Sequence, residues 1–238
     1  MILASQSPRR RQLLEETGFA LKICPTDIDE AARPDERPAE LVRRLASEKA
    51  EACRQTLSQG PADGLLVAAD TIVWSPELGV LGKPADPDDA RRTLAALSGR
   101  THHVSTGVSA LLLSPTCEVL DSVSFVETTD VTFYELTEAE IDAYVTTGDP
   151  MDKAGSYGIQ TPAGRLLVKS IAGDYDNVVG LPIPRLMREL SLLTHHDTGI
   201  LWPLQRISTA KERPKADPPL PGPEGLAQPT SPLSQEAP

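Results

Sequence analysis

Short apolar runs alternate along the chain with stretches whose apolar residues recur at helical spacing. The most apolar run, 64–69, predicts a central strand buried on both faces. Shorter runs predict strands at 2–4 and 21–24. Two segments rich in Val, Thr and Ser, 104–113 and 119–131, predict a long β pair.

Helix starts are marked by a capping residue before proline, or by a capping box. Ser7 precedes Pro8, Asp86 precedes Pro87, and Thr137 begins the box Thr-Glu-Ala-Glu. The predicted helices are 8–17, 38–57, 87–97, 138–147 and 184–193. After the fourth helix the pattern predicts a glycine- and charge-rich loop at 149–160, a strand at 166–168 and a second loop at 173–182.

The character of the chain changes at residue 194. The segment 194–238 holds nine of the 22 prolines, and no hydrophobic periodicity remains from residue 211 onward. Such a segment buries too little apolar surface to offset the entropy lost on ordering. The sequence therefore predicts one folded domain at 1–193 and a Pro-rich, disordered extension at 194–238, with a short docked piece around 200–202.

The composition is that of a globular protein with a sizeable core: 39% of the 238 residues are hydrophobic and 24% are charged. No apolar run approaches the roughly 20 residues that a membrane-spanning helix needs. The net charge of −11 disfavours nucleic acid and membrane surfaces as partners, since both attract basic proteins. Cys24, Cys53 and Cys117 form neither a disulfide framework nor a zinc motif, which favours the reducing cytoplasm.

The first candidate for chemistry is the start of the helix predicted at 8–17. Arginines occupy positions 9, 10 and 11, where the positive end of the helix dipole normally favours Asp or Glu. A phosphate between the free backbone N–H groups and the arginines would resolve this conflict. The alternative is an ordinary capped helix with its arginines in solvent.

Carboxylates form the second candidate. Asp70 follows the apolar run at 64–69 directly, and we expect it at the carboxyl end of that strand, opening on a cleft. A carboxylate there can bind a divalent cation or act as a general base. Glu30, beside Asp29, is a candidate second carboxylate of a metal site. The alternatives are a turn-forming aspartate and a solvated acidic loop.

Basic and amide side chains are the expected counterparts of a phosphate. Lys83 is held between Gly82 and Pro84 in a rigid loop, which is unusual for a merely solubilising lysine. Lys49, on a predicted helix, is either part of the site or an exposed partner of a nearby Glu. Gln160 ends a glycine-rich loop, and its amide both donates and accepts hydrogen bonds. That loop also contains Lys153, and a flexible surface loop is the alternative. The histidine pairs at 102–103 and 195–196 are interpreted as ordinary polar residues and not as metal ligands.

Seven short motifs occur in the order seen in the Maf family, which the chain resembles over residues 1–193. Each motif is weak alone, but seven in the same order are specific. They are LASQSPRR at 3–10, AADTIV at 68–73, GKP at 82–84, SGR at 98–100, TG at 106–107, MDKAGSYGIQ at 151–160 and NVVGLP at 177–182.

The resemblance implies an α/β fold with a long, curved, mixed β-sheet flanked by helices, and two lobes with a central cleft. It also implies hydrolysis of a nucleoside triphosphate to the monophosphate and pyrophosphate with a divalent metal cation, Mg²⁺ or Mn²⁺. Members are often dimeric, so a homodimer is one expected assembly.

The family motifs assign roles to particular residues of this chain. Asp70 matches the catalytic base, and Asp70 and Glu30 match the metal site. The phosphate-binding positions are Ser7, Lys49 and Lys83. Substrate specificity falls on Arg10, Thr71 and Gln160, where the chain resembles the branch of the family that acts on dTTP and UTP. The chain has Asp149 where the family usually has Glu, a shortening that we expect to matter little.

Two functions follow from these features. The first is metal-dependent hydrolysis of dTTP, UTP or modified pyrimidine nucleotides. A Gln160 amide suits it, because thymine and uracil show an acceptor–donor–acceptor edge. The second, suggested by the Pro-rich extension, is a non-catalytic nucleotide-binding regulator of cell division or stress that acts through a partner.

Overall fold

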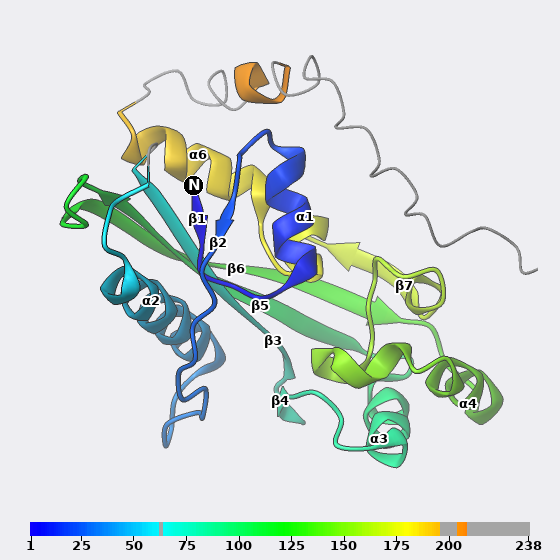
Figure 1. Cartoon of the computed structure of the whole chain (residues 1–238). Helices are drawn as coiled ribbons and strands as arrows, with labels where there is room; N and C mark the ends of the chain where they lie inside the picture. The colour runs from blue at the N-terminus through cyan, green and yellow to red at the C-terminus, as the bar shows by residue number, and fades with distance from the viewer. Residues whose placement is uncertain (62–63, 196–203, 209–238) are drawn as a thin grey trace, which may run out of the picture.

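The computed structural model describes residues 1–61, 64–195 and 204–208 (Figure 1). Within them, six strands form one mixed sheet in the order β2-β1-β3-β5-β6-β7, and a seventh, β4, pairs with β3. β1 is parallel to β2 and β3, whereas the other pairs are antiparallel. The strands are β1 (Ile2–Leu3), β2 (Lys22–Ile23), β3 (Leu65–Ser75), β4 (Gly79–Leu81), β5 (Thr101–Leu113), β6 (Val119–Phe133) and β7 (Val168–Ala172).

The five predicted helices are all confirmed, with ends that differ by a residue or so. Ser7 caps the first by accepting a hydrogen bond from the Arg10 amide, and Thr137 and Glu140 form the predicted capping box. The α-helices are α1 (Pro8–Glu16), α2 (Pro38–Thr56), α3 (Pro87–Leu97), α4 (Glu138–Thr146), α5 (Tyr175–Val179) and α6 (Ile183–Leu193). Short 3₁₀ turns occur at Asp149–Asp152, Ala154–Ser156 and Gly164–Leu166.

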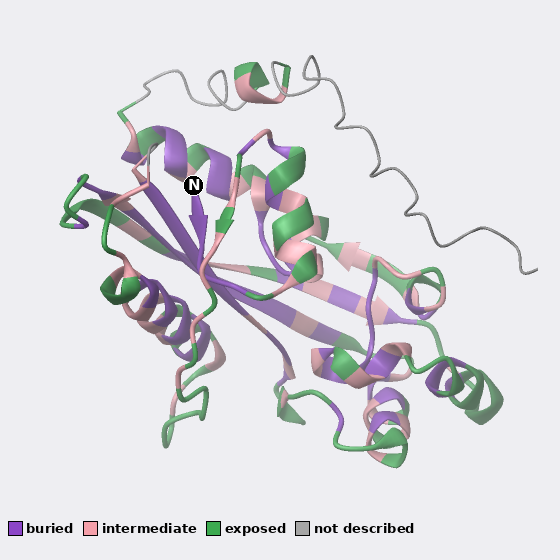
Figure 2. Cartoon of the chain, in the orientation of Figure 1, coloured by how far each residue is buried: buried purple, intermediate pink, exposed green. Residues whose placement is uncertain are grey.

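Helices cover both faces of the first part of β3, as its strand alternation requires. Leu65 and Val67 belong to an apolar cluster with residues of α1 and α6, whereas Leu66 and Ala68 pack on the α2 side. Buried residues accordingly follow the central strands and the inner faces of α2 and α6 (Figure 2). Gly107 of β5 lets α2 approach closely, because a Cβ there would lie 2.1 Å from the Val42 carbonyl oxygen.

A second lobe is built on the other end of the long strands. Leu94 of α3 and Ile141 of α4 pack there with Val104 and Phe133, in a cluster separate from the one under α1 and α6. Figure 1 shows α3 and α4 at the opposite end of β5 and β6 from α6. The expected mixed sheet, flanked by helices and carrying two lobes, is therefore present.

Three details of the predicted secondary structure are wrong: two strand boundaries and one segment predicted as a loop. The central strand does not end at Asp70 but continues to Ser75, because β5 pairs with it along nearly its whole length. Leu166 lies in a 3₁₀ turn with its side chain exposed, and the strand predicted at 166–168 begins only at Val168. The loop predicted at 173–182 contains α5, a helix too short to show a periodic pattern.

The predicted domain boundary coincides with the end of α6 at Leu193. Beyond it, residues 204–208 form a short helix, and the Arg206 guanidinium lies 4.0 Å from the centre of the Phe19 ring. The rest of the predicted extension, including the piece expected to dock at 200–202, lies outside the described residues. Among the helices that are described, none combines the length and the apolar character needed to cross a membrane.

Candidate active site

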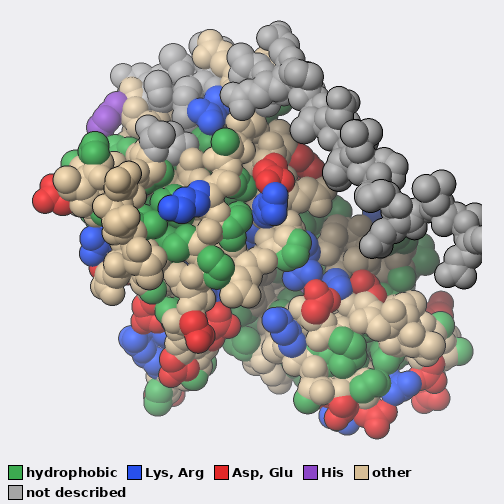
Figure 3. Space-filling model, viewed as in Figure 1, with side chains coloured by type: hydrophobic (Ala, Val, Ile, Leu, Met, Phe, Trp, Pro, Cys, Tyr) green, Lys and Arg blue, Asp and Glu red, His purple; other side chains and the backbone are tan. Residues whose placement is uncertain are grey.

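A cavity of about 800 Å³ lies between the two lobes. Its walls come from the start of α1, the middle of β3, α2 and the segments 152–160 and 178–180. In the space-filling view, Lys and Arg side chains gather along the hollow between the larger upper part and the smaller part at lower right (Figure 3). All eight site residues predicted from the sequence line this cavity: Ser7, Arg10, Glu30, Lys49, Asp70, Thr71, Lys83 and Gln160.

The cavity forms where one edge of β3 is open. On that edge β1 pairs with Leu66 and Val67, and β4 begins to pair only at Val73. Residues 68–72 have no strand partner on this side within the described part of the chain. Asp70 is therefore reachable from the cavity although it lies in the middle of a strand, and not at the strand end that we predicted.

Asp70 and its neighbour Thr71 point to opposite faces of the sheet, as successive strand residues do. Asp70 faces α2, where its carboxylate accepts from Lys49, and Thr71 faces α1, where its hydroxyl accepts from Arg10. The open edge exposes both side chains to the same cavity. Two sides of one strand thus contribute two different groups to one site.

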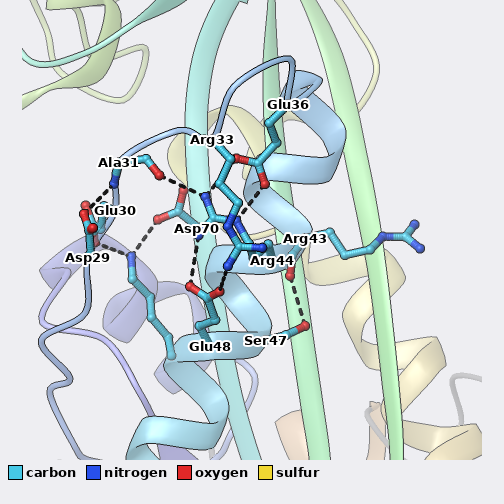
Figure 4. Close-up of polar contacts among 11 residues, drawn as sticks. Asp29, Glu30, Ala31, Arg33, Glu36, Arg43, Arg44, Ser47, Glu48 and Asp70 are labelled. Carbon is cyan, nitrogen blue, oxygen red and sulfur yellow. Dashed lines mark hydrogen bonds and ion pairs between the residues drawn. The ribbon is translucent and has the colours of Figure 1, made fainter.

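Lys49 joins two carboxylates. Its ammonium nitrogen Nζ lies 2.6 Å from Asp70 Oδ1 and 2.6 Å from Glu30 Oε1 (Figure 4). The Lys49 side chain is only 11% exposed, so it is not the exposed helix lysine that the sequence left open as an alternative. The Glu30 side chain is 61% exposed, and it reaches Lys49 from the loop that precedes α2.

On the α1 side of the cavity, the Arg10 side chain links three separate segments of the chain. Its guanidinium donates to the Gly180 carbonyl at 2.8 Å, to Thr71 Oγ1 at 2.9 Å and to Ser5 Oγ at 3.3 Å. Thr71 is also hydrogen-bonded to Thr106 of the neighbouring strand. Burial lowers the pKa of Arg10, and the Asp70 carboxylate acts in the opposite direction.

The three arginines of α1 have three different surroundings. Arg10 faces the cavity, whereas Arg11 is exposed and pairs with Glu15 one turn along the helix, as expected for a solvated residue. Arg9 also lines the cavity and forms an ion pair with Asp152 at 3.2 Å. Because Asp152 belongs to the second lobe, this ion pair bridges the cleft.

A hydrogen-bond network around Asp149 holds the loop that carries Gln160. The Asp149 carboxylate accepts from the hydroxyls of Tyr144 and Thr161, each at 2.7 Å, and pairs with Lys153 at 3.0 Å. These hydrogen bonds lower the pKa of Asp149, although burial opposes them. The aspartate side chain therefore reaches three partners around this loop.

Lys83 stands at the exposed rim of the cavity, on the loop after β4. The carbonyl of Gly82 accepts a hydrogen bond from the Gly155 amide, which fastens this rim to the second lobe. Gly155 has φ of +69° and lies against Val73, where a Cβ would come within 3.0 Å of the valine side chain. The close approach explains why this position needs glycine.

The adjacent histidines 102 and 103 lie in different surroundings. His102 is fully buried between the rings of Phe133 and Tyr157, and its Nε2 lies 2.9 Å from the Tyr157 hydroxyl. Burial lowers the pKa of His102 to about 4, with a smaller effect from His103. His103 is partly exposed and lies 2.7 Å from Asp130. Neither belongs to a metal cluster among the described residues.

Positive charge is concentrated in the cavity compared with the rest of the chain. The lining has five basic and four acidic residues, whereas the whole chain has 23 Lys and Arg against 34 Asp and Glu. An acidic protein that binds a phosphorylated ligand needs such a local excess.

The carboxylate pair fits a divalent cation. Asp70 and Glu30 converge on one point, 2.6 Å from each, where Lys49 Nζ now lies. The second oxygen of each carboxylate accepts no hydrogen bond within the part of the chain that the structure describes. Mg²⁺ typically binds one or two carboxylates and completes its shell with water and substrate phosphates. No cluster of three or more His, Cys, Asp or Glu suited to a metal is present in that part of the chain, so further ligands would come from the substrate or water.

Lys153 was among the basic side chains named from the sequence, but no role was assigned to it. It is buried with its ammonium group near Asp149 and Asp152, and its spacing of four residues from Asp149 was a detectable signal. Asp152, the partner of Arg9, lies 143 residues away in the sequence, so no local pattern could predict this contact. The Gly180 carbonyl that accepts from Arg10 is a backbone group, which side-chain patterns do not reveal.

The mixed α/β sheet and the cation-lined cavity at the open edge of its central strand define a class of protein: an α/β protein with a site for a phosphorylated ligand. The chain belongs to the Maf family, because the family model for Maf-like proteins matches residues 1–193. A relative from Agathobacter rectalis, named dTTP/UTP pyrophosphatase, is 46% identical over 204 residues, which cover 81% of this chain and 97% of the relative. Relatives of the same name from Bacillus cereus strain G9842 and Bacillus anthracis are 46% identical over 190 residues, covering 80% of this chain and 93% of each relative.

Proposed function

We propose that this protein is a nucleoside triphosphate pyrophosphatase that hydrolyses dTTP, UTP and modified pyrimidine nucleotides to the monophosphate and pyrophosphate. The observation that carries the proposal is the convergence of Asp70, Lys49 and Glu30 in the same cavity as Arg10 and Thr71. The names of relatives that match most of the chain support the same reaction.

The basic side chains serve to bind and orient the triphosphate. Lys49 and Lys83 both line the cavity and neutralise phosphate charge. Ser7 contributes its hydroxyl at the start of α1, where unpaired backbone N–H groups also favour an anion. Together these groups hold the triphosphate with its α-phosphorus toward Asp70.

Asp70 is the general base of the proposed reaction. A carboxylate on the open edge of β3 can accept a proton from a water molecule that attacks the α-phosphorus. The bond between the α-phosphorus and the bridging oxygen breaks, and pyrophosphate leaves. Lys49 orients the Asp70 carboxylate, because its ammonium group lies 2.6 Å from Asp70 Oδ1.

A divalent cation, Mg²⁺ or Mn²⁺, is the proposed cofactor. Asp70 and Glu30 are the residues that would hold it. Asp70 would then serve both as a ligand of the cation and as the general base. When bound, such an ion withdraws charge from the phosphates and lowers the pKa of bound water. Lys49 then competes with the ion for the same two carboxylates, so it would turn toward the phosphates.

Arg10, Thr71 and Gln160 are the proposed specificity residues. Arg10 and Thr71 form one hydrogen-bonded unit on the α1 side, and Gln160 faces the cavity from the second lobe. A pyrimidine edge with two acceptors and a donor can pair with an amide group. Guanine presents donors at the positions of those acceptors and would leave buried groups unpaired.

A nucleotide panel tests the proposal. Pyrophosphate release is measured with dTTP, UTP, CTP, GTP and 7-methyl-GTP, each with Mg²⁺, with Mn²⁺ and with EDTA. We expect turnover of dTTP and UTP that EDTA abolishes. Activity confined to 7-methyl-GTP, or release of single phosphates, would contradict the proposal. Binding of dTTP without turnover in either metal would instead favour the regulatory alternative.

We also propose that the enzyme works in the cytoplasm, and that it forms a homodimer like many members of its family. Three free cysteines suit a reducing compartment. Analytical ultracentrifugation of the full chain measures the assembly directly, and a single species of 25.6 kDa would exclude the dimer.

A further inference from the structure

The loop before α2 carries Glu30 to the site, although Glu30 itself is mostly exposed. Its side chain is 61% exposed, and Lys49 is its one ion-pair partner within the described residues. A surface ion pair of this kind is worth little by itself and does not fix a loop. The position of Glu30 therefore depends on what holds the loop around it.

Arg44 of α2 holds that loop. Its Nη2 donates to the carbonyl of Ala31, the residue after Glu30, at 3.0 Å. Its Nε and Nη2 also donate to the two carboxylate oxygens of Glu36, at 2.7 and 2.8 Å. The Arg44 side chain is only 13% exposed, so these charge-assisted bonds are shielded from water. One guanidinium thus ties both ends of the segment 31–36 to the helix.

Two further contacts close the same network. Arg44 Nη1 pairs with Glu48 at 3.0 Å, and Glu48 in turn pairs with Arg33 of the loop at 3.0 Å. Glu48 directly precedes Lys49 on α2, so the network and the partner of Glu30 are carried by the same turn of the helix. Figure 4 shows Glu36, Glu48 and Ala31 gathered around Arg44, while Arg43 points away from them.

The central pair of the network, Glu36 and Arg44, favours its charged form. Hydrogen bonds from Arg44 and from the Arg33 amide lower the pKa of Glu36 to about 2. The hydrogen bond with Glu36 raises the pKa of Arg44 in return. The ion pair between them therefore persists at neutral pH.

We propose that Arg44 is a positioning residue that places Glu30 beside Lys49 and Asp70, and so sets the affinity of the site for a divalent cation. This inference rests on the proposed function, since it concerns the same carboxylate pair. Arg44 itself does not line the cavity and has no direct role in the reaction.

The test compares Arg44→Gln with Arg43→Gln in the full chain. Arg43 is the matched control, because it is the adjacent arginine on the same helix and its side chain is exposed and makes no hydrogen bond or ion pair within the described residues. Mn²⁺ binding is followed by loss of the free-ion EPR signal, and turnover of dTTP is followed as a function of Mn²⁺ concentration.

We expect Arg44→Gln to weaken Mn²⁺ binding about tenfold or more, the scale seen when the support of a metal ligand is removed. The rate at saturating Mn²⁺ should fall much less, and Arg44→Lys should recover part of the affinity. Hydrogen exchange should rise at the amides of residues 29–36 but not along α2. Arg43→Gln should stay within about twofold of the wild type in every assay.

A Glu30→Gln background separates positioning from general stability. If Arg44 acts through Glu30, Arg44→Gln has little further effect on Mn²⁺ binding in that background. An equal effect with and without Glu30, or unchanged Mn²⁺ binding in Arg44→Gln, overturns the inference while the wild-type enzyme still releases pyrophosphate. Failure of the wild type to hydrolyse any nucleotide overturns the proposed function instead.

Discussion

At the scale of single residues, Asp70 lines the cavity as expected, but it does so from a position in its strand that we did not expect. The sequence predicts an aspartate at a strand end, and the structure places it within β3, six residues along an eleven-residue strand. The carboxylate is accessible because the partner strand on one edge changes from β1 to β4. Such a change of partner depends on residues far away in the sequence, so the local pattern could not show it.

Asp70→Asn tests this residue directly. The amide cannot accept a proton from water, so we expect turnover of dTTP to fall at least about a hundredfold, the usual scale for a general base. Lys49 keeps Glu30 as a partner, so the melting temperature should change by only a few degrees. Steady-state kinetics and thermal denaturation measure the two effects, and a near-normal rate would refute the assignment.

At the scale of secondary-structure elements, the strongest sequence signals are confirmed. The caps at Ser7, Asp86 and Thr137 each begin a helix where predicted, since capping is a local interaction. α5 was missed because its five residues are fewer than two turns. The ion pair that joins α1 to the second lobe, between Arg9 and Asp152, was missed because its partners are remote in sequence.

The eight predicted site residues line one cavity. They were assigned from the resemblance to the family that seven ordered motifs indicated, and their spacing alone did not predict the cavity. The same motifs gave no information about Arg44, whose partners are four, eight and thirteen residues away and lie partly in a loop. Tertiary hydrogen bonds of this kind require the fold to be known.

The element that carries Gln160 provides a second prediction. Asp149→Ala removes the carboxylate that accepts hydrogen bonds from both Tyr144 and Thr161, and Thr161 is the residue after Gln160. The Asp149 carboxylate is partly buried, and a hydrogen bond to a charged group is worth about 1.5 kcal/mol or more. Because the loss falls on the loop that positions Gln160, KM for dTTP should rise roughly tenfold. The rate at saturation should change less, because Asp70 lies on the other lobe.

The matched comparison for Asp149 is Asp149→Asn, which keeps one acceptor oxygen and should have the smaller effect. Initial rates over a range of dTTP concentrations separate KM from kcat. Unchanged KM in Asp149→Ala would show that this network does not position Gln160.

At the scale of the whole molecule, His102 should make stability depend on pH. The folded pKa of about 4 lies below the ordinary value of about 6.5, so between these values only the unfolded chain takes up a proton. The free energy of unfolding should therefore fall as pH decreases from about 6.5 to about 4. The full shift corresponds to about 3 kcal/mol.

Denaturant unfolding at several pH values measures this slope. His102→Asn should lose most of the part that lies between pH 4 and 6.5, whereas His103→Asn, at the partly exposed neighbour, should keep it. Equal slopes in wild type and His102→Asn would contradict the assignment of the slope to His102.

The extension at 194–238 should be dispensable for catalysis. Among the residues that the structure describes, every one that lines the cavity precedes residue 181, and the family match ends at residue 193. We expect a chain truncated after Thr194 to keep kcat and KM for dTTP within about twofold of the full chain. A loss of turnover on truncation would contradict this prediction and would show that the extension takes part in the activity.

The measurement that tests the central claim most directly is the fate of oxygen from water. Hydrolysis of dTTP in ¹⁸O-labelled water, with Mg²⁺ or Mn²⁺, is analysed by mass spectrometry of both products. Attack at the α-phosphorus by a water that Asp70 activates predicts one ¹⁸O atom in dTMP and none in pyrophosphate. Label in pyrophosphate, or dTDP with labelled phosphate, would contradict the account.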